Sequence, residues 1–279
     1  MRQPGASRKP NPAREGWAGH RGRPMIAGMW GLDLIAVVVA SFLLAGLVKG
    51  LVGLGLPTVA LALLATQLDL KAAIPLVLVP SLATNIWQAV SGGALAALLK
   101  RLWPLLAVAC LGIWFGAGLL AGLDARLLSG LFGTILCVYA LVSVARAQVP
   151  APGRWERWLS PLVGAVNGVI TGLTGSFIFP SVLYLQALGL PRDQLIQAMG
   201  LTFLVSTLAM GVALAGHTLL PAEAGLLSAL ALIPALVGMA LGQRFRKTLP
   251  EERFRRLFFL ALAALGAYLA WAAFLQPGI

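Results

Sequence analysis

Apolar residues gather in long runs, and polar residues are confined to the short segments between them. One helical crossing of a bilayer needs about 20 predominantly apolar residues. The pattern therefore predicts an all-α polytopic membrane protein. The runs lie near Leu32–Leu68, Ala72–Leu99, Leu102–Leu123, Ala125–Ala145, Leu159–Leu190, Gln194–Gly216, Leu220–Gly242 and Leu257–Phe274.

Two of these runs are too long for a single crossing, and both contain glycine. The run Leu32–Leu68 is interrupted by Gly46–Pro57, and the run Leu159–Leu190 is interrupted by Gly172–Gly175. Irregular backbone at membrane depth is tolerated only where protein covers it or where it lines a wet cavity. We therefore predict that each run is a broken helical hairpin beside a site, with two short arms that enter and leave on the same side.

The two halves of the chain repeat one order of elements. Gly46-x3-Gly50 aligns with Gly164-x3-Gly168, and Pro57 aligns with Pro180 after a short insertion. Each half is predicted as a broken hairpin followed by three transmembrane helices, with repeats over residues 25–146 and 159–279 and a cytoplasmic linker over 147–158. Interrupted helices at matching positions of two repeats indicate a transporter binding site.

Composition and charge support the membrane assignment and give it an orientation. Hydrophobic residues make up 59% of the chain and charged residues 11%, whereas soluble domains contain about 45–50% and about 25%. The net charge is +12, but the basic residues collect in a few loops and a tail. This distribution favours cytoplasmic loops over nucleic-acid binding. If the first run starts outside, most basic loops from Lys100 to Arg256 are cytoplasmic and the two repeats are inverted.

The basic tail over residues 1–24 does not fit this orientation, because the scheme places it outside. Its composition predicts disorder, not a signal peptide. Two readings stay open. Either the cellular protein starts at Met25 and the tail is absent, or only the first broken run is a full crossing.

Lys49 is the only full charge inside the first break. A lysine at membrane depth costs about 2.5 kcal/mol or more, which makes it a candidate for attracting an anion. The alternative is that Lys49 extends to the membrane interface, because the arms of the hairpin are short. The alignment places Asn167 at the equivalent position of the second half.

Glycines and helix starts supply the second group of candidates. Glycine permits unusual backbone conformations and close approach of a ligand, and the free N–H groups and dipole of a helix start favour an anion. We expect new helices to begin at Pro57-Thr58 and near Thr174-Gly175-Ser176. Packing of helices through small residues is the alternative. The candidates are Gly50, Gly53, Gly55, Thr58, Thr171, Thr174, Gly175 and Ser176.

Polar residues on the following helices complete the candidate site. Ser81, Thr84, Asn85 and Gln88 have the spacing of one helical face, and Ser206 lies on a similar face of the second half together with Thr202 and Thr207. These groups can donate hydrogen bonds to an oxyanion, or they can link helices. Neither the two histidines nor the two cysteines form a metal or catalytic cluster, and no carboxylate lies in the middle of a run. No cofactor, metal or enzymatic activity is therefore expected.

These motifs resemble the TauE/SafE sulfite exporter family over the whole apolar chain from about Leu32 onward. The resemblance is carried by Lys49-Gly50-x2-Gly53-x-Gly55-x-Pro57-Thr58, Pro80-Ser81-x2-Thr84-Asn85-x2-Gln88, Thr171-Gly172-x-Thr174-Gly175-x4-Pro180 and Tyr184-Leu185-Gln186. It implies a carrier in the bacterial inner membrane for small anions, among them sulfite and short organosulfur acids. We expect alternating access at the interface of two inverted repeats. A passive anion channel and a membrane scaffold or assembly factor are the alternatives.

Overall fold

The computed structural model describes residues 32–145, 150–245 and 251–275, and its regular elements there are all helices. The tail over residues 1–24, Met25 and part of the predicted linker lie outside these ranges. The elements are α1 (Leu32–Val52), α2 (Leu56–Leu64), α3 (Leu70–Leu76), α4 (Leu78–Val90), α5 (Leu95–Gly122), α6 (Ala125–Val144), the 3-10 turn η2 (Gly153–Trp155), α7 (Glu156–Thr174), α8 (Ser181–Ala187), α9 (Arg192–Gly216), α10 (Ala222–Phe245) and α11 (Glu251–Leu275).

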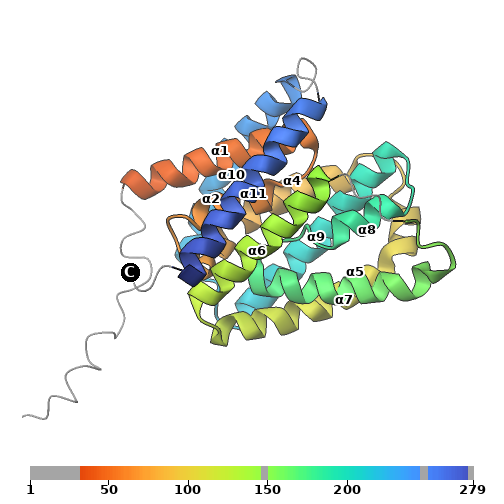
Figure 1. Ribbon diagram of the computed structural model, residues 1–279, viewed down its shortest axis with the longest axis horizontal. Coiled ribbons are helices and arrows are strands. Elements are labelled where there is room, and N and C mark those ends of the chain that lie inside the picture. Colours follow the sequence, from red (N-terminus) through yellow and green to blue (C-terminus); the bar gives the residue numbers. More distant parts are fainter. Residues whose placement is uncertain (1–31, 146–149, 246–250, 276–279) are drawn as a thin grey trace, which may run out of the picture.

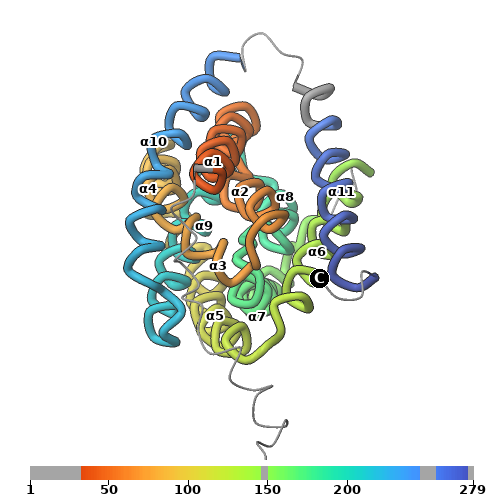
Figure 2. The backbone as a smooth tube through the Cα atoms, turned by 90° about the vertical axis from the view of Figure 1, so that its left-hand side faces the viewer, coloured from red at the N-terminus to blue at the C-terminus, as the bar shows by residue number. Residues whose placement is uncertain are grey.

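Six of the described helices are long and apolar enough to cross a membrane, namely α1, α5, α6, α9, α10 and α11. The pair α3 and α4 passes the same test together and is bent by 45°. The described helices therefore allow six crossings, or seven if this bent pair counts as one crossing. The predicted all-α membrane protein is therefore confirmed. The long helices surround the short helices α2, α3 and α8, which lie at the centre of the molecule (Figures 1 and 2).

The bend between α3 and α4 follows from proline chemistry. Pro80 has no N–H group, so it cannot bond the carbonyl of Leu76 one turn earlier. Ser228 of α10 supplies the missing hydrogen bond. Its hydroxyl donates to Leu76 O (2.8 Å) and accepts from Val79 N–H (3.0 Å). The bend is thus stabilised by a side chain from a distant part of the sequence.

Both predicted breaks exist, but the first is shorter than the predicted Gly46–Pro57 and the second, over residues 175–180, lies later than the predicted Gly172–Gly175. Helix α1 continues through Gly46 and Gly50 and ends at Val52, and left-handed Gly53 (φ 86°) and Gly55 (φ 100°) separate it from α2. Helix α7 ends at left-handed Gly175 (φ 69°). The expected helix start near Thr174–Ser176 is wrong, because α8 begins only at Ser181 after a non-helical segment.

Most of the other glycines in these runs pack helices closely. A Cβ on Gly46 or Gly50 would clash with backbone of α10, and a Cβ on Gly238 of α10 would clash with backbone of α1. Helices α7 and α5 form the same kind of seam. Its small residues include Gly112 and Gly116 on α5 and Gly164, Gly168 and Gly172 on α7.

The two breaks share a backbone feature that offers a second alignment of the halves, one helical turn from the predicted one. The N–H of Gly53 donates to Lys49 O and that of Gly175 donates to Thr171 O, each at 2.7 Å. An alignment that pairs Gly53 with Gly175 also pairs Lys49 with Thr171, whereas the predicted alignment pairs Lys49 with Asn167. In the same register Gly46 and Gly50 match Gly168 and Gly172. The second half has three glycines at this spacing, so the sequence alone offered two registers.

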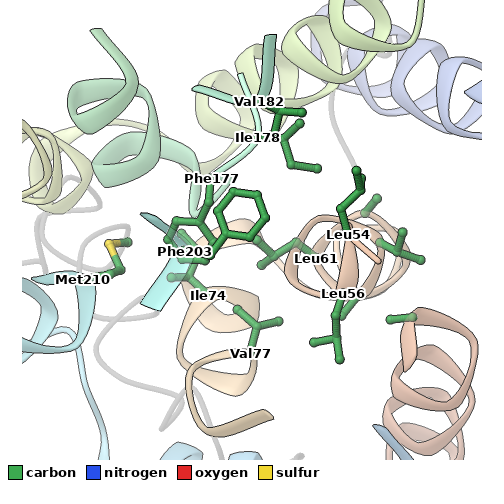
Figure 3. Close-up of a cluster of buried hydrophobic side chains, with 14 of the residues drawn as sticks. Leu54, Leu56, Leu61, Ile74, Val77, Phe177, Ile178, Val182, Phe203 and Met210 are labelled. Atoms are coloured by element: carbon green, nitrogen blue, oxygen red, sulfur yellow. The ribbon is translucent and has the colours of Figure 1, made fainter. Parts of the chain in front are cut away.

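Apolar side chains fill the centre of the molecule (Figure 3). Leu54, Leu56 and Leu61 come from the first break and α2, and they belong to the same buried cluster as Phe177 and Ile178 from the second break. A Cβ on Gly175 would come within 3.0 Å of Leu61 Cδ1. The two breaks therefore approach each other through hydrocarbon, because apolar burial favours tight packing there.

The described loops lie at two opposite ends of the molecule, as their contacts show. Arg101 bonds Glu156 at one end, where Ala94 also bonds Gln197. At the opposite end Lys71 bonds the carbonyl of Ala121, and the segments around Asp69, Arg126 and Tyr268 line one pocket. The end with Arg101 carries most of the described basic residues near loops, which is the grouping that the charge pattern predicts. Much of the basic segment 244–256 lies outside the described side chains.

Candidate functional site

Lys49 lies in the last turn of α1 and points into the protein. Its side chain is 5% exposed, and its ammonium group donates to Thr84 Oγ1 (3.1 Å) and to Asn85 Oδ1. The Lys49 side chain is therefore covered by protein and does not extend to the surface of the molecule. The backbone places it there because the helix continues to Val52, one turn beyond Lys49.

No carboxylate compensates Lys49 among the side chains that the structure describes. It is the one charged residue that is buried there, and its two hydrogen-bond acceptors are neutral. A buried ion costs several kcal/mol unless a partner of opposite charge and further hydrogen bonds offset it. A positive charge on Lys49 would therefore have no counter-ion among the described side chains around it.

Helix α4 presents the predicted polar face to Lys49. Ser81, Thr84, Asn85 and Gln88 are all buried on α4. The hydroxyl of Thr84 donates a hydrogen bond to Pro80 O (2.8 Å), so the lone pairs of its oxygen can accept a hydrogen bond from Lys49. Asn85 accepts from Lys49, while its Nδ2 group and the hydroxyl of Ser81 are buried without a partner. Two donors beside the ammonium group therefore remain unused.

Gln88 links the first break to the rest of the fold. Its Nε2 group donates to Gly53 O (3.1 Å) and to Ile196 O (2.9 Å), so both amide protons are in use. Gln197 makes the reciprocal link from α9, since its Nε2 donates to Ala89 O (2.8 Å) and its Oε1 accepts from Ala94 N–H (3.0 Å). Sequence reasoning missed Gln197, although an amide in an apolar run was the available signal.

The remaining candidates of the first half lie at the break itself. Gly53 and Gly55 adopt the left-handed backbone that glycine favours, and Gly55 precedes α2. Thr58 is fully buried in the first turn of α2, and its hydroxyl has no partner. Gly50 is the exception. It lies on the seam with α10, where it allows close helix packing.

The candidates of the second half gather at the second break. Thr171 donates to Ser176 O (2.9 Å), and Thr174 donates to Ile170 O (2.7 Å) and accepts from Ser176 N–H (3.3 Å). These two hydroxyls hold the end of α7, with Gly175 beside them. The hydroxyls of Ser176 and of Ser206 on α9 are buried without a partner.

Hydrogen bonds join Lys49 to Thr84 and Asn85 in the first half and Thr171 to Ser176 in the second half. Lys49, Asn85 and Ser81 belong to the first group, and Thr171 and Ser176 to the second, with the apolar cluster of Figure 3 between the breaks. Sequence reasoning gave no site role to Asn167, which is fully buried on α7 with both ends of its amide unpartnered. Its signal was again an amide within an apolar run.

The first group has the chemistry of an anion site. It contains one ammonium group, an amide N–H₂ and a hydroxyl, all in a water-poor environment where hydrogen bonds to charged groups are strong. Within the described ranges no group of three or more His, Cys, Asp or Glu side chains could hold a metal ion.

The chain was compared with protein families, curated proteins and solved structures. The model of the family described as "Sulfite exporter TauE/SafE" matches residues 38–269. This match includes both breaks and both polar groups. No curated protein and no solved structure matches the chain.

Proposed function

This chain belongs to the TauE/SafE sulfite exporter family, and on that premise we propose that it exports a small anion, such as sulfite or a short organosulfonate, across a bacterial inner membrane. The family is one of membrane transporters for anions of the sulfite type, and the six apolar helices fit a multi-pass protein. The substrate-binding group in this proposal is Lys49 with Asn85 and Ser81.

The burial of Lys49 without a described counter-ion carries the proposal. An anion that enters beside Lys49 would supply the missing negative charge, and Asn85 Nδ2 and the Ser81 hydroxyl would satisfy its oxygens. An oxyanion matches donors of this kind better than a cation or a neutral solute, because all of the unused groups can donate. Thr84 and Gln88 position this group, since Thr84 holds the ammonium and Gln88 holds the break.

We further propose that the two halves are inverted repeats. The seam between α1 and α10 has its counterpart in the seam between α7 and α5, and the left-handed glycines Gly53 and Gly175 end α1 and α7 in the same way. Helix α7 starts at the end of the molecule that holds Arg101, whereas α1 ends near it at Gly53, which Gln88 links to Ile196. The two helices therefore run in opposite directions.

Alternating access is the transport mechanism that this packing favours. Leu54 and Leu61 of one break and Phe177 and Ile178 of the other belong to one dry cluster. An ion cannot pass closely packed hydrocarbon. Separation of the two breaks on one side at a time would give the anion access without an open pore.

The test measures anion-dependent thermal stability of the purified protein in detergent with sulfite, sulfate, thiosulfate, sulfoacetate, taurine and chloride. A ligand at 100 times its Kd stabilises a protein by about 2.7 kcal/mol. We expect one oxyanion to raise the Tm, and Lys49→Ala and Asn85→Ala to remove the increase. If no oxyanion changes the Tm, or if both variants respond like the wild type, the proposed site is wrong.

Flux in proteoliposomes separates the remaining functional classes. A carrier saturates with substrate and exchanges internal for external anion, a passive channel does neither, and a scaffold transports nothing. Lys49→Ala is the informative variant. Gly50→Leu is not, because a side chain there clashes with Met239 and Gln243 of α10 whatever the function.

A further inference from the structure

Four exposed residues form a basic and aromatic cluster where η2 passes into α7. Arg154, Trp155, Arg157 and Trp158 line a surface pocket of about 420 Å³. We call these four residues the Arg–Trp cluster. Trp155 is 58% exposed and Trp158 is 63% exposed, so the cluster leaves a large aromatic surface uncovered.

Each arginine of the Arg–Trp cluster lies over the ring of its neighbour. The guanidinium carbon of Arg154 is 5.6 Å from the centre of the Trp155 ring, and that of Arg157 is 5.4 Å from the centre of the Trp158 ring. These distances allow cation–π attraction. The rings therefore orient two guanidinium groups that keep donors available for a phosphate, which arginine binds through paired hydrogen bonds.

The one acidic residue within the cluster's sequence does not cancel its charge. Glu156 lies between Trp155 and Arg157, but its carboxylate bonds Arg101 through Nε (2.6 Å) and NH2 (2.8 Å). That ion pair also ties α7 to α5. The two arginines of the cluster thus present two positive charges to whatever lies outside.

An apolar stripe continues from the cluster along α7. Trp158, Leu162 and Val166 follow one another at intervals of four residues, so they share one face of the helix. They are 63%, 58% and 44% exposed. The opposite face of α7 carries the glycines of the seam with α5, so the stripe points away from the protein. In a membrane protein, such a stripe faces acyl chains.

We propose that the Arg–Trp cluster and the stripe bind one anionic phospholipid. The phosphodiester lies against Arg154 and Arg157, the tryptophan rings lie at the level of the headgroup, and an acyl chain follows Trp158, Leu162 and Val166. Tryptophan favours this depth in a bilayer, and arginine near the surface attracts anionic lipid. A soluble phosphate compound could occupy the arginines but would leave the stripe uncovered. The proposal requires that the chain spans a membrane and is independent of what it transports.

Native mass spectrometry of the purified full chain in detergent tests the proposal. Phosphatidylglycerol is titrated against phosphatidylcholine with the same acyl chains, and glycerol phosphate is the arm without acyl chains. We expect tighter retention of phosphatidylglycerol than of the other two. Arg154→Gln/Arg157→Gln should weaken it by roughly tenfold or more, because each arginine near a membrane surface contributes on the order of 1 kcal/mol.

Lys100→Gln/Arg244→Gln is the matched control. Both residues are exposed and lie at the same end of the molecule as the Arg–Trp cluster. The two substitutions remove the same total charge as Arg154→Gln/Arg157→Gln. The control should retain phosphatidylglycerol within about twofold of the wild type, and an unchanged Tm verifies that each variant is folded. The proposal is overturned if both double variants lose the lipid equally, if phosphatidylcholine binds as well as phosphatidylglycerol, or if glycerol phosphate binds as well as the lipid.

Discussion

At the scale of single residues, the proposed chemistry depends most on Lys49. Lys49 is held by two neutral acceptors, Thr84 and Asn85, and no described carboxylate is buried near it. A charged group in such a position is stabilised most by an ion of opposite sign. The proposed substrate provides that ion only transiently, whereas a substitution could provide it permanently.

Asn85→Asp should turn the proposed anion site into an internal ion pair. The new carboxylate occupies the position of the amide that Lys49 already contacts, so it neutralises the ammonium. We expect a Tm at or above the wild-type value and loss of the stabilisation by oxyanions. Thermal unfolding with and without sulfite measures both effects.

Asn167→Asp is the control for this prediction. Asn167 is equally buried and the same change places a carboxylate there without a described cation beside it. Leaving a buried charge unpaired costs about 3–5 kcal/mol, so we expect a clearly lower Tm or poor folding. If Asn85→Asp behaves like Asn167→Asp, Lys49 does not carry the charge that the proposal requires.

The ion pair at the surface gives a prediction on pH. The hydrogen bonds from Arg101 hold the pKa of Glu156 below its ordinary value of 4.5. A carboxylate whose pKa is lowered by folding stabilises the protein above that ordinary value, and this contribution disappears as the pH falls through the lowered pKa. Because both side chains are partly exposed, the effect should stay below about 1 kcal/mol.

Glu156→Gln should remove this contribution. At pH 7 the variant should have a slightly lower Tm than the wild type, and the difference should shrink toward pH 3. Equal Tm differences at both pH values would mean that the ion pair does not contribute.

At the scale of elements, glycine seams hold the long helices together. Lipid provides no hydrophobic force between apolar helices, so close backbone contact becomes the main source of attraction. Gly46 and Gly50 on α1 meet Gly238 and Gly242 on α10 at such a contact. The sequence pattern suggested a ligand site for some of these glycines, and the structure assigns them to packing.

Gly238→Ala and Gly225→Ala separate packing from helix propensity on one helix. Both glycines lie in α10, but a Cβ on Gly238 clashes with Leu43 O and Leu47 N of α1, whereas a Cβ on Gly225 meets nothing within 4 Å. Gly238→Ala should lower the free energy of unfolding by about 1–3 kcal/mol or more. Gly225→Ala should change it little or raise it by about 0.5–1 kcal/mol.

Thermal or denaturant unfolding in detergent measures both variants. Comparable destabilisation by the two changes would contradict the seam as a source of stability. Gly211→Ala on α9, which also has free space around it, serves as a second control.

At the scale of the whole molecule, the two ends differ in charge and therefore in expected location. The end with Arg101, Arg154 and Arg157 should be cytoplasmic, because cytoplasmic loops carry an excess of lysine and arginine. The end with Asp69 and Glu223 should then face the periplasm. In this orientation, the proposed export moves the substrate from the basic end to the other end.

Single cysteines at the two ends test the orientation. In a Cys110→Ser/Cys137→Ser background, Glu223→Cys should react with a membrane-impermeant maleimide in intact spheroplasts. Lys100→Cys should react only after the membrane is permeabilised. Both original residues are exposed, so lack of access to the residue itself does not explain a negative result. The reverse pattern would overturn the orientation.

The sequence by itself determined the class of the protein. A long apolar run in lipid must satisfy its backbone N–H and C=O groups internally, and an α-helix does this within a single segment. It also located the two breaks, the polar face of α4 and the family. These features depend on local spacing. Residues such as Ser81 and Asn85 share a face whenever their segment is helical.

Only the tertiary structure decided which glycines bend the backbone and which pack helices. Glycine permits both: Gly164, Gly168 and Gly172 of α7 pack against α5, whereas Gly175 adopts the left-handed backbone that ends the helix. The same applies to the amides. Gln88 became a link between Gly53 and Ile196, whereas Asn85 kept a free donor beside Lys49. Sequence spacing gives a residue its helical face, but the neighbouring helices determine which partners remain for a ligand.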